Sequence, residues 1–371
     1  MAETPGEAAQ APLIQQANFE KITQLVSAQF QSEESLLEHG IPTYYLKQPQ
    51  ETKRAFLDLL KSLESISMTA LLRKIDGRVV LKVVPKPQVK PSNILVNWIL
   101  LFATIGTTFL TGYVLSLDFG GTGLMSSPFV GGALFSVAIM TVLGAHEMGH
   151  KLTADRNGID ATPPYFIPGP PPIGEAIGLG TFGAVIMQKS LPPNRDALFD
   201  IGSSGPIVGF ILALVASVVG LLYSPISPST ANELAVPAPL IFEIIGTFIP
   251  RLSERALHPV AFAGWAGMVV TMLNLLPVAQ LDGGHVARSL FGEKGRTVLT
   301  VLSVLLLVVT DFWPMAIFVL FMSMYRHPGP LDDVSSLSNG RKLLAVGLVV
   351  IFVLSSYIHY WILYLLSLLG V

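Results

Sequence analysis

The chain has 371 residues, of which 51% are hydrophobic and 13% are charged, and its mean hydropathy is +0.59. Soluble domains carry about 25% charged residues, so this composition excludes an ordinary soluble protein and predicts a polytopic membrane protein. The formal net charge of −2 argues against a nucleic-acid partner, and the absence of cysteine excludes disulfides and thiolate metal ligands.

The first 92 residues are predicted to form a soluble α+β domain and a linker, because they contain no apolar segment long enough to cross a bilayer. Two segments have the periodicity of amphipathic helices, and two alternating segments flank Asp76-Gly77, a strong signal for a β-hairpin turn. These are the helices 19–31 and 50–63 and the strands 68–75 and 78–84. A tethering role and a substrate-recruiting role both stay open for this domain.

Residues 93–371 are predicted to form an α-helical membrane domain with its core at about 128–296. Segment 298–325 is apolar but interrupted by Asp311 and Pro314, and is either one kinked helix or a hairpin of two short helices. Segment 241–249 is too short to cross and is expected to be interfacial or re-entrant. Five further segments are long enough to span a bilayer: 94–117, 128–151, 201–223, 259–281 and 343–369. Together with segment 298–325 they give about six to seven spanning helices.

The second predicted span ends in His146-Glu147-Met148-Gly149-His150. Two histidines four residues apart share one face of a helix and can bind one zinc ion, and the glutamate between them is placed to take a proton from water. Ionisable side chains are costly in hydrocarbon and usually functional there. The motif is short enough to occur by chance, and a polar helix end at the headgroup level is the simpler alternative.

Two features lie between the second and fourth predicted spans. Segment 162–190 is rich in Pro and Gly, and its alternating run 181–188 predicts a β-hairpin or an edge strand at the membrane boundary. Such a strand could pair with an extended substrate or form a structural flap, and both interpretations place it beside the metal. The small residues of 202–206, with Gly209, favour close packing of the third span on the metal-binding helices over catalysis by the serines among them.

A second polar stretch, from Asn274 to His285, ends the fourth predicted span. Pro277 removes a backbone donor and should break or kink the helix near Asn274. If the second and fourth spans run parallel, Asp282 supplies a third zinc ligand and leaves a fourth position open for water. Asn274 is expected either to stabilise the oxyanion or to satisfy carbonyls freed by the proline, and His285 either to support the ligands or to face water.

The HEMGH sequence at 146–150 together with NLLPVAQLDGG at 274–284 resembles the site-2 protease family of intramembrane zinc metalloproteases. The likeness extends over roughly 92–342 and, through TPPYFIPGPP and RHPGPLDDVSSL, is similar to the cyanobacterial and plastid branch known by the ethylene-dependent gravitropism-deficient and yellow-green proteases.

This resemblance implies a catalytic core of three helices, the second, third and fourth spans, that cleaves transmembrane protein substrates within the bilayer. It also implies one Zn²⁺ per chain, with His146, His150 and Asp282 as ligands and Glu147 as the catalytic base. Apart from the resemblance, four histidines are isolated in the sequence, and each is expected to face solvent or the membrane interface: His39, His258, His327 and His359.

Two other classes of function stay open. A transporter would also have polar residues at a broken helix, but it would usually show an internal repeat, which the sequence lacks. A catalytically silent or gated membrane scaffold would bind partners without cutting them, although such a site has no need of Glu147.

The distribution of Lys and Arg predicts an amino terminus and a zinc site that face the cytoplasm, with Arg251 and Arg255 on the opposite side as evidence against it. The first residues have neither an apolar signal core nor the Arg-rich character of a transit peptide, so we expect a protein of a prokaryotic plasma membrane.

Overall fold

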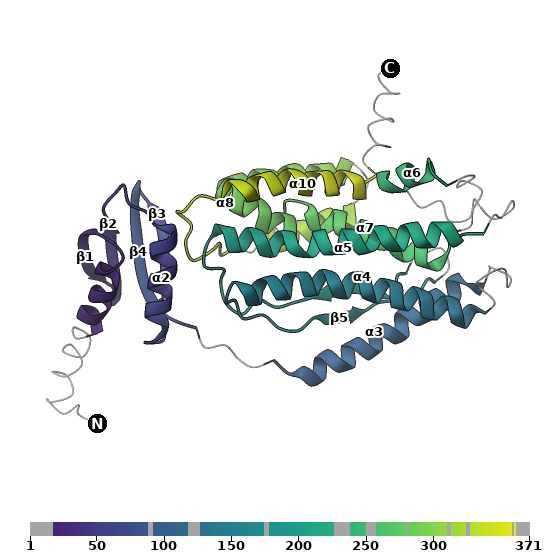
Figure 1. The fold of residues 1–371 in the computed structure, drawn as a ribbon, viewed down its shortest axis with the longest axis horizontal. Helices are drawn as coiled ribbons and strands as arrows, with labels where there is room; N and C mark the ends of the chain where they lie inside the picture. The colour runs from purple at the N-terminus through teal and green to yellow at the C-terminus, as the bar shows by residue number, and fades with distance from the viewer. Residues whose placement is uncertain are drawn as a thin grey trace, which may run out of the picture. The chain divides into compact units, whose positions relative to one another are not determined.

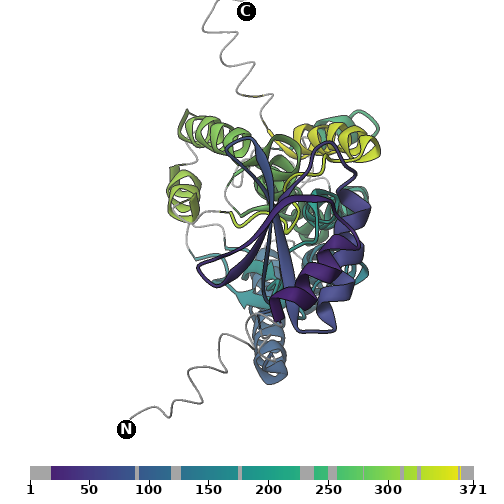
Figure 2. The same cartoon turned by 90° about the vertical axis from the view of Figure 1, so that its left-hand side faces the viewer.

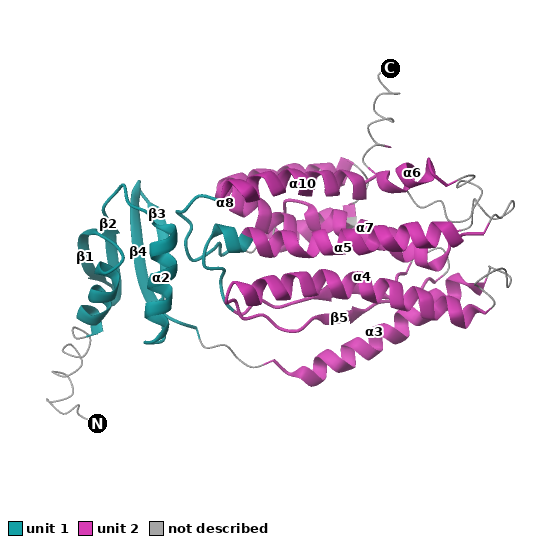
Figure 3. Ribbon diagram, viewed as in Figure 1, with its two compact units in different colours: residues 1–90, 190–198, 328–337 teal, residues 91–189, 199–327, 338–371 magenta. Residues whose placement is uncertain are grey.

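The computed structural model describes residues 18–87, 92–117, 127–173, 178–225, 238–249, 257–278, 280–309, 313–323, 327–357 and 360. The chain divides into two compact units (Figure 3). Unit 1 consists of residues 1–90, 190–198 and 328–337, and unit 2 consists of residues 91–189, 199–327 and 338–371.

Unit 1 contains a four-stranded antiparallel sheet in the order β1-β2-β4-β3. A helix at 18–27 and a second helix, α2, pack along the sheet (Figure 2). The bounds are β1 (Ser32–Glu38), β2 (Ile41–Leu46), α2 (Lys53–Glu64), β3 (Met68–Ile75) and β4 (Arg78–Pro85). On the helix-covered face Tyr44, Leu81 and Leu72 are paired across three strands and fully buried. The predicted helical and alternating periodicities therefore meet in one apolar core.

The predicted hairpin turn at Asp76-Gly77 is present, with φ values of 48° and 83° that suit a two-residue type I′ turn. The hairpin of β1 and β2 was not predicted. Its turn residues, His39 and Gly40, have similar positive φ values of 50° and 80°. Histidine is an uncommon residue at such a position, so the turn lacks the usual Asn-Gly or Asp-Gly signal.

Two segments distant in sequence complete unit 1. The backbone N–H of Leu72 in β3 donates to the carbonyl of Leu331, and the N–H of Asp333 donates to the carbonyl of Leu72. Arg195 forms an ion pair with Asp333 at 3.2 Å. The fully buried carboxylate of Asp332 accepts hydrogen bonds from the backbone N–H groups of Val334 and Ser335. Unit 1 is therefore closed by residues that lie far beyond the predicted soluble domain.

Unit 2 is mostly helical (Figure 1). Its helices, the first turn of α5 belonging to unit 1, are α3 (Ile94–Leu115), α4 (Pro128–Arg156), α5 (Arg195–Tyr223), α6 (Leu240–Gly246), α7 (Pro259–Leu275), α8 (Asp282–Val309), α9 (Trp313–Ser323) and α10 (Asn339–Ser355). Strands β5 (Tyr165–Pro168) and β6 (Thr181–Val185) form an antiparallel hairpin. By length and apolar composition α3, α4 and α5 could each cross a membrane, and α7 is a shorter apolar helix.

The predicted helical membrane architecture and small amino-terminal sheet are confirmed, whereas the number of spans stays a prediction. Segment 259–281 is not one helix, because α7 ends at Leu275 and α8 begins only at Asp282. Segment 298–325 includes parts of α8 and α9, which pack together through Leu307, Ala316 and Val319. The predicted interruption at Asp311 lies outside the described residues, as does the end of segment 343–369.

Glycines bring α3 and α4 close together. A Cβ at Gly132 of α4 would lie 2.9 Å from the carbonyl oxygen of Phe109, and a Cβ at Gly112 of α3 would lie 3.0 Å from the carbonyl oxygen of Gly131. The hydroxyls of Thr108 and Ser136 form a buried hydrogen bond of 2.8 Å between the two helices. Small residues and interhelical hydrogen bonds are the usual means of helix association in lipid, so α3 is held firmly against α4.

Candidate metal centre

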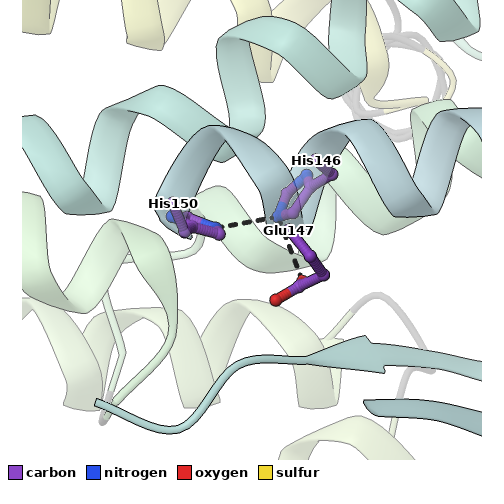
Figure 4. A group of neighbouring side chains, drawn as sticks. All are labelled: His146, Glu147 and His150. Atoms are coloured by element: carbon purple, nitrogen blue, oxygen red, sulfur yellow. Dashed lines mark hydrogen bonds and ion pairs between the residues drawn. The ribbon is translucent and has the colours of Figure 1, made fainter. Parts of the chain in front are cut away.

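The HEMGH sequence lies within α4, which continues to Arg156 beyond the predicted end of the span. His146, Glu147 and His150 leave the same stretch of the helix, as Figure 4 shows. Their exposed fractions are 3%, 8% and 5%. Among the described residues they form a group whose ligand atoms lie within 4.8 Å of one another. Three ionisable groups are thus buried together, which is costly unless they bind a metal or one another.

Asp282 reaches this group from the first turn of α8. Pro277 lies in the non-helical stretch after α7. This break lets the chain change direction, so that the Asp282 carboxylate lies beside the two histidines. The Asp282 carboxylate is 3.1 Å from Nε2 of His146 and 3.2 Å from Nε2 of His150. The two Nε2 atoms are 3.1 Å apart. The structure therefore brings together the three predicted ligands from positions 136 residues apart.

These three separations fit a tetrahedral metal centre. Zinc binds His nitrogen and carboxylate oxygen at about 2.0–2.2 Å, and two tetrahedral ligands at that distance lie about 3.3 Å apart. The donor set of two imidazoles and one carboxylate is also that of hydrolytic zinc sites, which keep one position open. The residues present fit a zinc ion on both geometry and chemistry.

Helix α5 fixes the orientation of the His150 ring. Nδ1 of His150 lies 2.7 Å from the carbonyl oxygen of Ile201, so Nδ1 carries the proton and Nε2 keeps its lone pair for a metal. The ring fits because α5 has glycine opposite it: a Cβ at Gly205 would overlap the His150 imidazole, and one at Gly209 would lie 2.8 Å from Nδ1 of His146. The predicted close packing of these small residues on the histidines is present.

Glu147 lies one step away from the three ligands. Its carboxylate is 4.0 Å from Nε2 of His146, close enough to act on a group held by the ligands. The main-chain N–H of Ile186, the residue after β6, lies near this carboxylate. The predicted hairpin of segment 162–190 therefore does lie beside the site.

The Asn274 side chain also points into the site, with Nδ2 at 3.2 Å from Nε2 of His146. Of the two roles considered for Asn274, a hydrogen bond to a reacting group fits this position better than the repair of carbonyls freed by Pro277. His285 hydrogen-bonds Nε2 of His327 at 2.8 Å and does not simply face water. His327 and His258 are 7% and 3% exposed, so the expectation that they face solvent was wrong.

Two backbone groups at the site were not predicted: the carbonyl of Ile201, which accepts from His150, and the N–H of Ile186, which lies near Glu147. No motif marks them, because every residue carries these groups and only the fold selects which ones meet a side chain. The hydroxyls of Ser203 and Ser204 bond to carbonyls of their own helix, in agreement with a packing role.

Comparison with known proteins agrees with this geometry. Residues 134–310 match peptidase family M50, and this range contains the two histidines, Glu147, Asn274 and Asp282. The resemblance stated from the sequence is thereby confirmed. The match to peptidase family M50 extends from within α4 to the end of α8 and covers just under half of the chain.

The chain is also similar to curated proteins. The chain is 32% identical over 253 residues to Probable zinc metalloprotease EGY1, chloroplastic, of Arabidopsis thaliana, a match that covers 63% of this chain and 44% of the relative. It is 29% identical over 222 residues to Probable zinc metalloprotease EGY2, chloroplastic, of Arabidopsis thaliana, covering 57% and 38%. Probable zinc metalloprotease EGY3, chloroplastic, of Oryza sativa subsp. indica is 30% identical over 218 residues, covering 52% and 35%.

The chain therefore spans less than half the length of these curated relatives. No solved structure matches it. The M50 match and the long apolar helices identify an integral membrane protein, whereas the chloroplastic relatives differ from the prokaryotic origin expected from the sequence.

Proposed function

We propose that this chain is an intramembrane zinc endopeptidase that hydrolyses peptide bonds in or near the transmembrane segments of membrane proteins. The observation that supports it most strongly is the meeting of His146, His150 and Asp282 at 3.1–3.2 Å beside Glu147. The two histidines and Glu147 lie on the apolar helix α4, and Asp282 lies on α8, after the break at Pro277. A binding scaffold would need no carboxylate at position 147.

In this proposal the ligands of the metal are His146, His150 and Asp282. When bound, zinc supplies Lewis-acid activation of a water molecule and of the scissile carbonyl. Glu147 takes the proton of that water and returns it to the leaving amine, the work of a general base and then a general acid. The Asn274 amide donates to the oxygen on which negative charge develops. The Ile201 carbonyl holds His150 in the tautomer that binds metal.

The hairpin gives this chemistry access to an extended substrate. Within the described residues β6 pairs with β5 alone, and Phe182 on β6 is 75% exposed. A transmembrane helix must unwind before its peptide bonds can be cut, and β6 offers main-chain groups to the unwound segment. Such pairing would place substrate backbone beside Ile186 and Glu147.

The finer organisation belongs to the same proposal. It includes a soluble domain over 1–92, a membrane domain over 93–371 with its core at about 128–296, and about six to seven spans. It also includes one zinc ion per chain, and an amino terminus and active site on the positively charged side of the membrane, which is the cytoplasmic side for a plasma membrane. The substrates are transmembrane proteins in a lipid bilayer.

The test is cleavage of a single-span test protein by the purified full-length chain in proteoliposomes, with zinc measured in the same samples. Native protein should cut, and Glu147→Gln should lose at least about 100-fold in rate while it retains zinc, since general-base catalysis contributes roughly 10²–10⁴-fold. Cleavage should also stop on treatment with a chelator and return with added zinc.

Loss of cleavage in Glu147→Gln tests the role of Glu147, and loss of cleavage with a chelator tests the metal centre. Equal cutting by native protein and Glu147→Gln would show that Glu147 is not the base. Bound zinc without cutting in any sample would favour the scaffold, and absence of zinc from the native protein would overturn the metal centre itself.

A further inference from the structure

Helix α3 lies outside the three-helix core implied by the resemblance, yet it carries buried polar side chains. Most of its surface is apolar and exposed, including Trp98 at 52% and Phe102 at 65%, as suits a helix that faces lipid. Asn97 is only 8% exposed, and Thr107 is partly buried. Polar groups in a membrane helix usually face protein and have partners there. Both of these side chains bond the β5–β6 hairpin.

The first contact lies at the start of β5. Nδ2 of Asn97 donates to the carbonyl oxygens of Pro163 and Pro164 at 3.2 and 3.0 Å. These are the last two residues before Tyr165, where β5 begins. Carbonyl groups outside regular structure need partners at membrane depth, and one amide group serves both.

The second contact lies at the start of β6. Oγ1 of Thr107 donates to the carbonyl oxygen of Gly180 at 2.6 Å. Gly180 has φ +71°, and a Cβ there would lie 2.7 Å from Cα of Thr108. The chain thus passes directly against α3, at a distance that only glycine allows.

The two contacts match the length of the hairpin. Asn97 and Thr107 are ten residues apart on α3, which is about 15 Å of helix. Antiparallel strands begin at opposite ends of a hairpin, and four to five residues at about 3.3 Å each give roughly 13–17 Å. The hairpin therefore lies along α3 with a polar contact at each end.

This anchoring reaches the catalytic glutamate. The hairpin also packs on α4, where the Phe166 ring lies 3.4 Å from the position of a Cβ on Gly144, two residues before His146. The chain that leaves β6 brings the Ile186 N–H near the Glu147 carboxylate. A shift of the hairpin along α3 would consequently move both the free edge of β6 and the N–H near Glu147.

We propose that Asn97 and Thr107 are positioning residues that fix the register of the hairpin along α3, and thereby decide which peptide bond of an extended substrate faces Glu147. The proposal rests on the proposed proteolytic function for its consequence in cleavage, but the anchoring itself does not. Loss of either anchor should loosen the hairpin and spread cleavage over neighbouring peptide bonds.

The first experiment measures the hairpin directly, without activity. The chain contains no cysteine, so a single cysteine at position 182 can carry a nitroxide label in the otherwise native protein. Thr107→Val and Asn97→Leu should increase label mobility in electron paramagnetic resonance spectra, and Thr107→Ser, which keeps the hydroxyl, should restore the native spectrum.

Thr104→Val is the matched control. Among the described residues the Thr104 hydroxyl donates to Leu100 within α3, and the substitution replaces a threonine by the isosteric valine as Thr107→Val does. A spectrum unchanged by Thr107→Val and by Asn97→Leu, or changed equally by Thr104→Val, would overturn the anchoring. This outcome does not depend on whether the chain cuts anything.

The second experiment maps cleavage positions in a single-span test protein by mass spectrometry. Native protein and Thr104→Val should give one dominant bond, whereas Thr107→Val and Asn97→Leu should divide cutting between two or more adjacent bonds. Increased label mobility with an unchanged cleavage position would overturn the role in register while leaving the protease intact. Absence of cutting by native protein would count against the proposed function.

Discussion

The two units differ in where they place apolar and polar side chains. The core of unit 1 is apolar, with Phe56, Leu59 and Leu72 fully buried between the helices and the sheet. In unit 2 many large apolar side chains point outward, as on α8 and α9, while His146 and Asn97 are turned inward. Water drives the first arrangement, and lipid permits the second, since it is as apolar as leucine.

The difference separates what burial does in each unit. Removal of apolar area from water stabilises unit 1 directly. The polar groups buried in unit 2 are costly on their own and persist because they bond one another or a metal. Burial in unit 1 is therefore evidence about stability, whereas burial of an ionisable side chain in the helices of unit 2 is evidence about function.

The largest expected effect is at the metal centre. Asp282→Asn keeps the size of the side chain but removes the ligand charge, and zinc affinity should fall by at least about 100-fold, since a zinc site shares roughly 10–16 kcal/mol among its ligands. Competition with a chelator of known affinity measures this. Unchanged affinity would show that Asp282 is not a ligand, and helix content by circular dichroism should match the native chain.

In unit 1 the comparison predicts a loss of stability without a change in metal binding. Phe56→Ala leaves a cavity in the apolar core and should cost about 3–5 kcal/mol of unfolding free energy. Phe102→Ala on the lipid-facing surface of α3 is the matched control and should cost far less. Denaturant unfolding followed by hydrogen exchange of the sheet would decide, and equal losses would contradict the contrast between the two interiors.

Two helical glycines sharpen the contrast within unit 2. A Cβ at Gly205 overlaps the His150 ring, so Gly205→Ala should cost about 1–3 kcal/mol and weaken zinc binding. Gly106→Ala on α3 meets nothing within 4 Å and should be neutral or stabilising by up to about 1 kcal/mol. Thermal unfolding in detergent and zinc titration of both variants would test this, and a harmless Gly205→Ala would mean that α5 does not confine the ring.

The smallest effect concerns the surface of unit 1. The hydrogen bond from Lys82, 2.9 Å long, together with one from Tyr45, holds the pKa of Glu38 below its ordinary value of 4.5. The folded-state pKa is the lower one, so this stabilisation is present above about pH 4.5 and is lost as the pH falls through the folded value. Lys82→Met should reduce the acid sensitivity slightly, because exposed pairs contribute little.

Hydrogen exchange of β1 and β2 over pH 3–6, corrected for the intrinsic rate, would measure this difference. Lys61→Met is the control, since Lys61 and Asp58 form a looser and more exposed pair at 3.7 Å. An identical pH dependence in the native chain and Lys82→Met would contradict the assignment.

The sequence by itself determined the chemistry of this protein. Long apolar segments predict a membrane protein, and HEMGH with an aspartate after a broken helix predicts a metal centre, because both signals rest on local periodicity and on side-chain type. The hairpin at Asp76-Gly77 was equally local. The hairpin at His39-Gly40 escaped notice because its turn residues are atypical.

Only the tertiary structure decided which distant groups meet. The carbonyl of Ile201 on His150, the N–H of Ile186 near Glu147, and the anchors of α3 on the hairpin are contacts of backbone groups that every residue possesses. The addition of segments 190–198 and 328–337 to unit 1 is likewise a pairing across long sequence separation. Local patterns specify which chemistry a chain carries, but packing alone selects the partners that orient it.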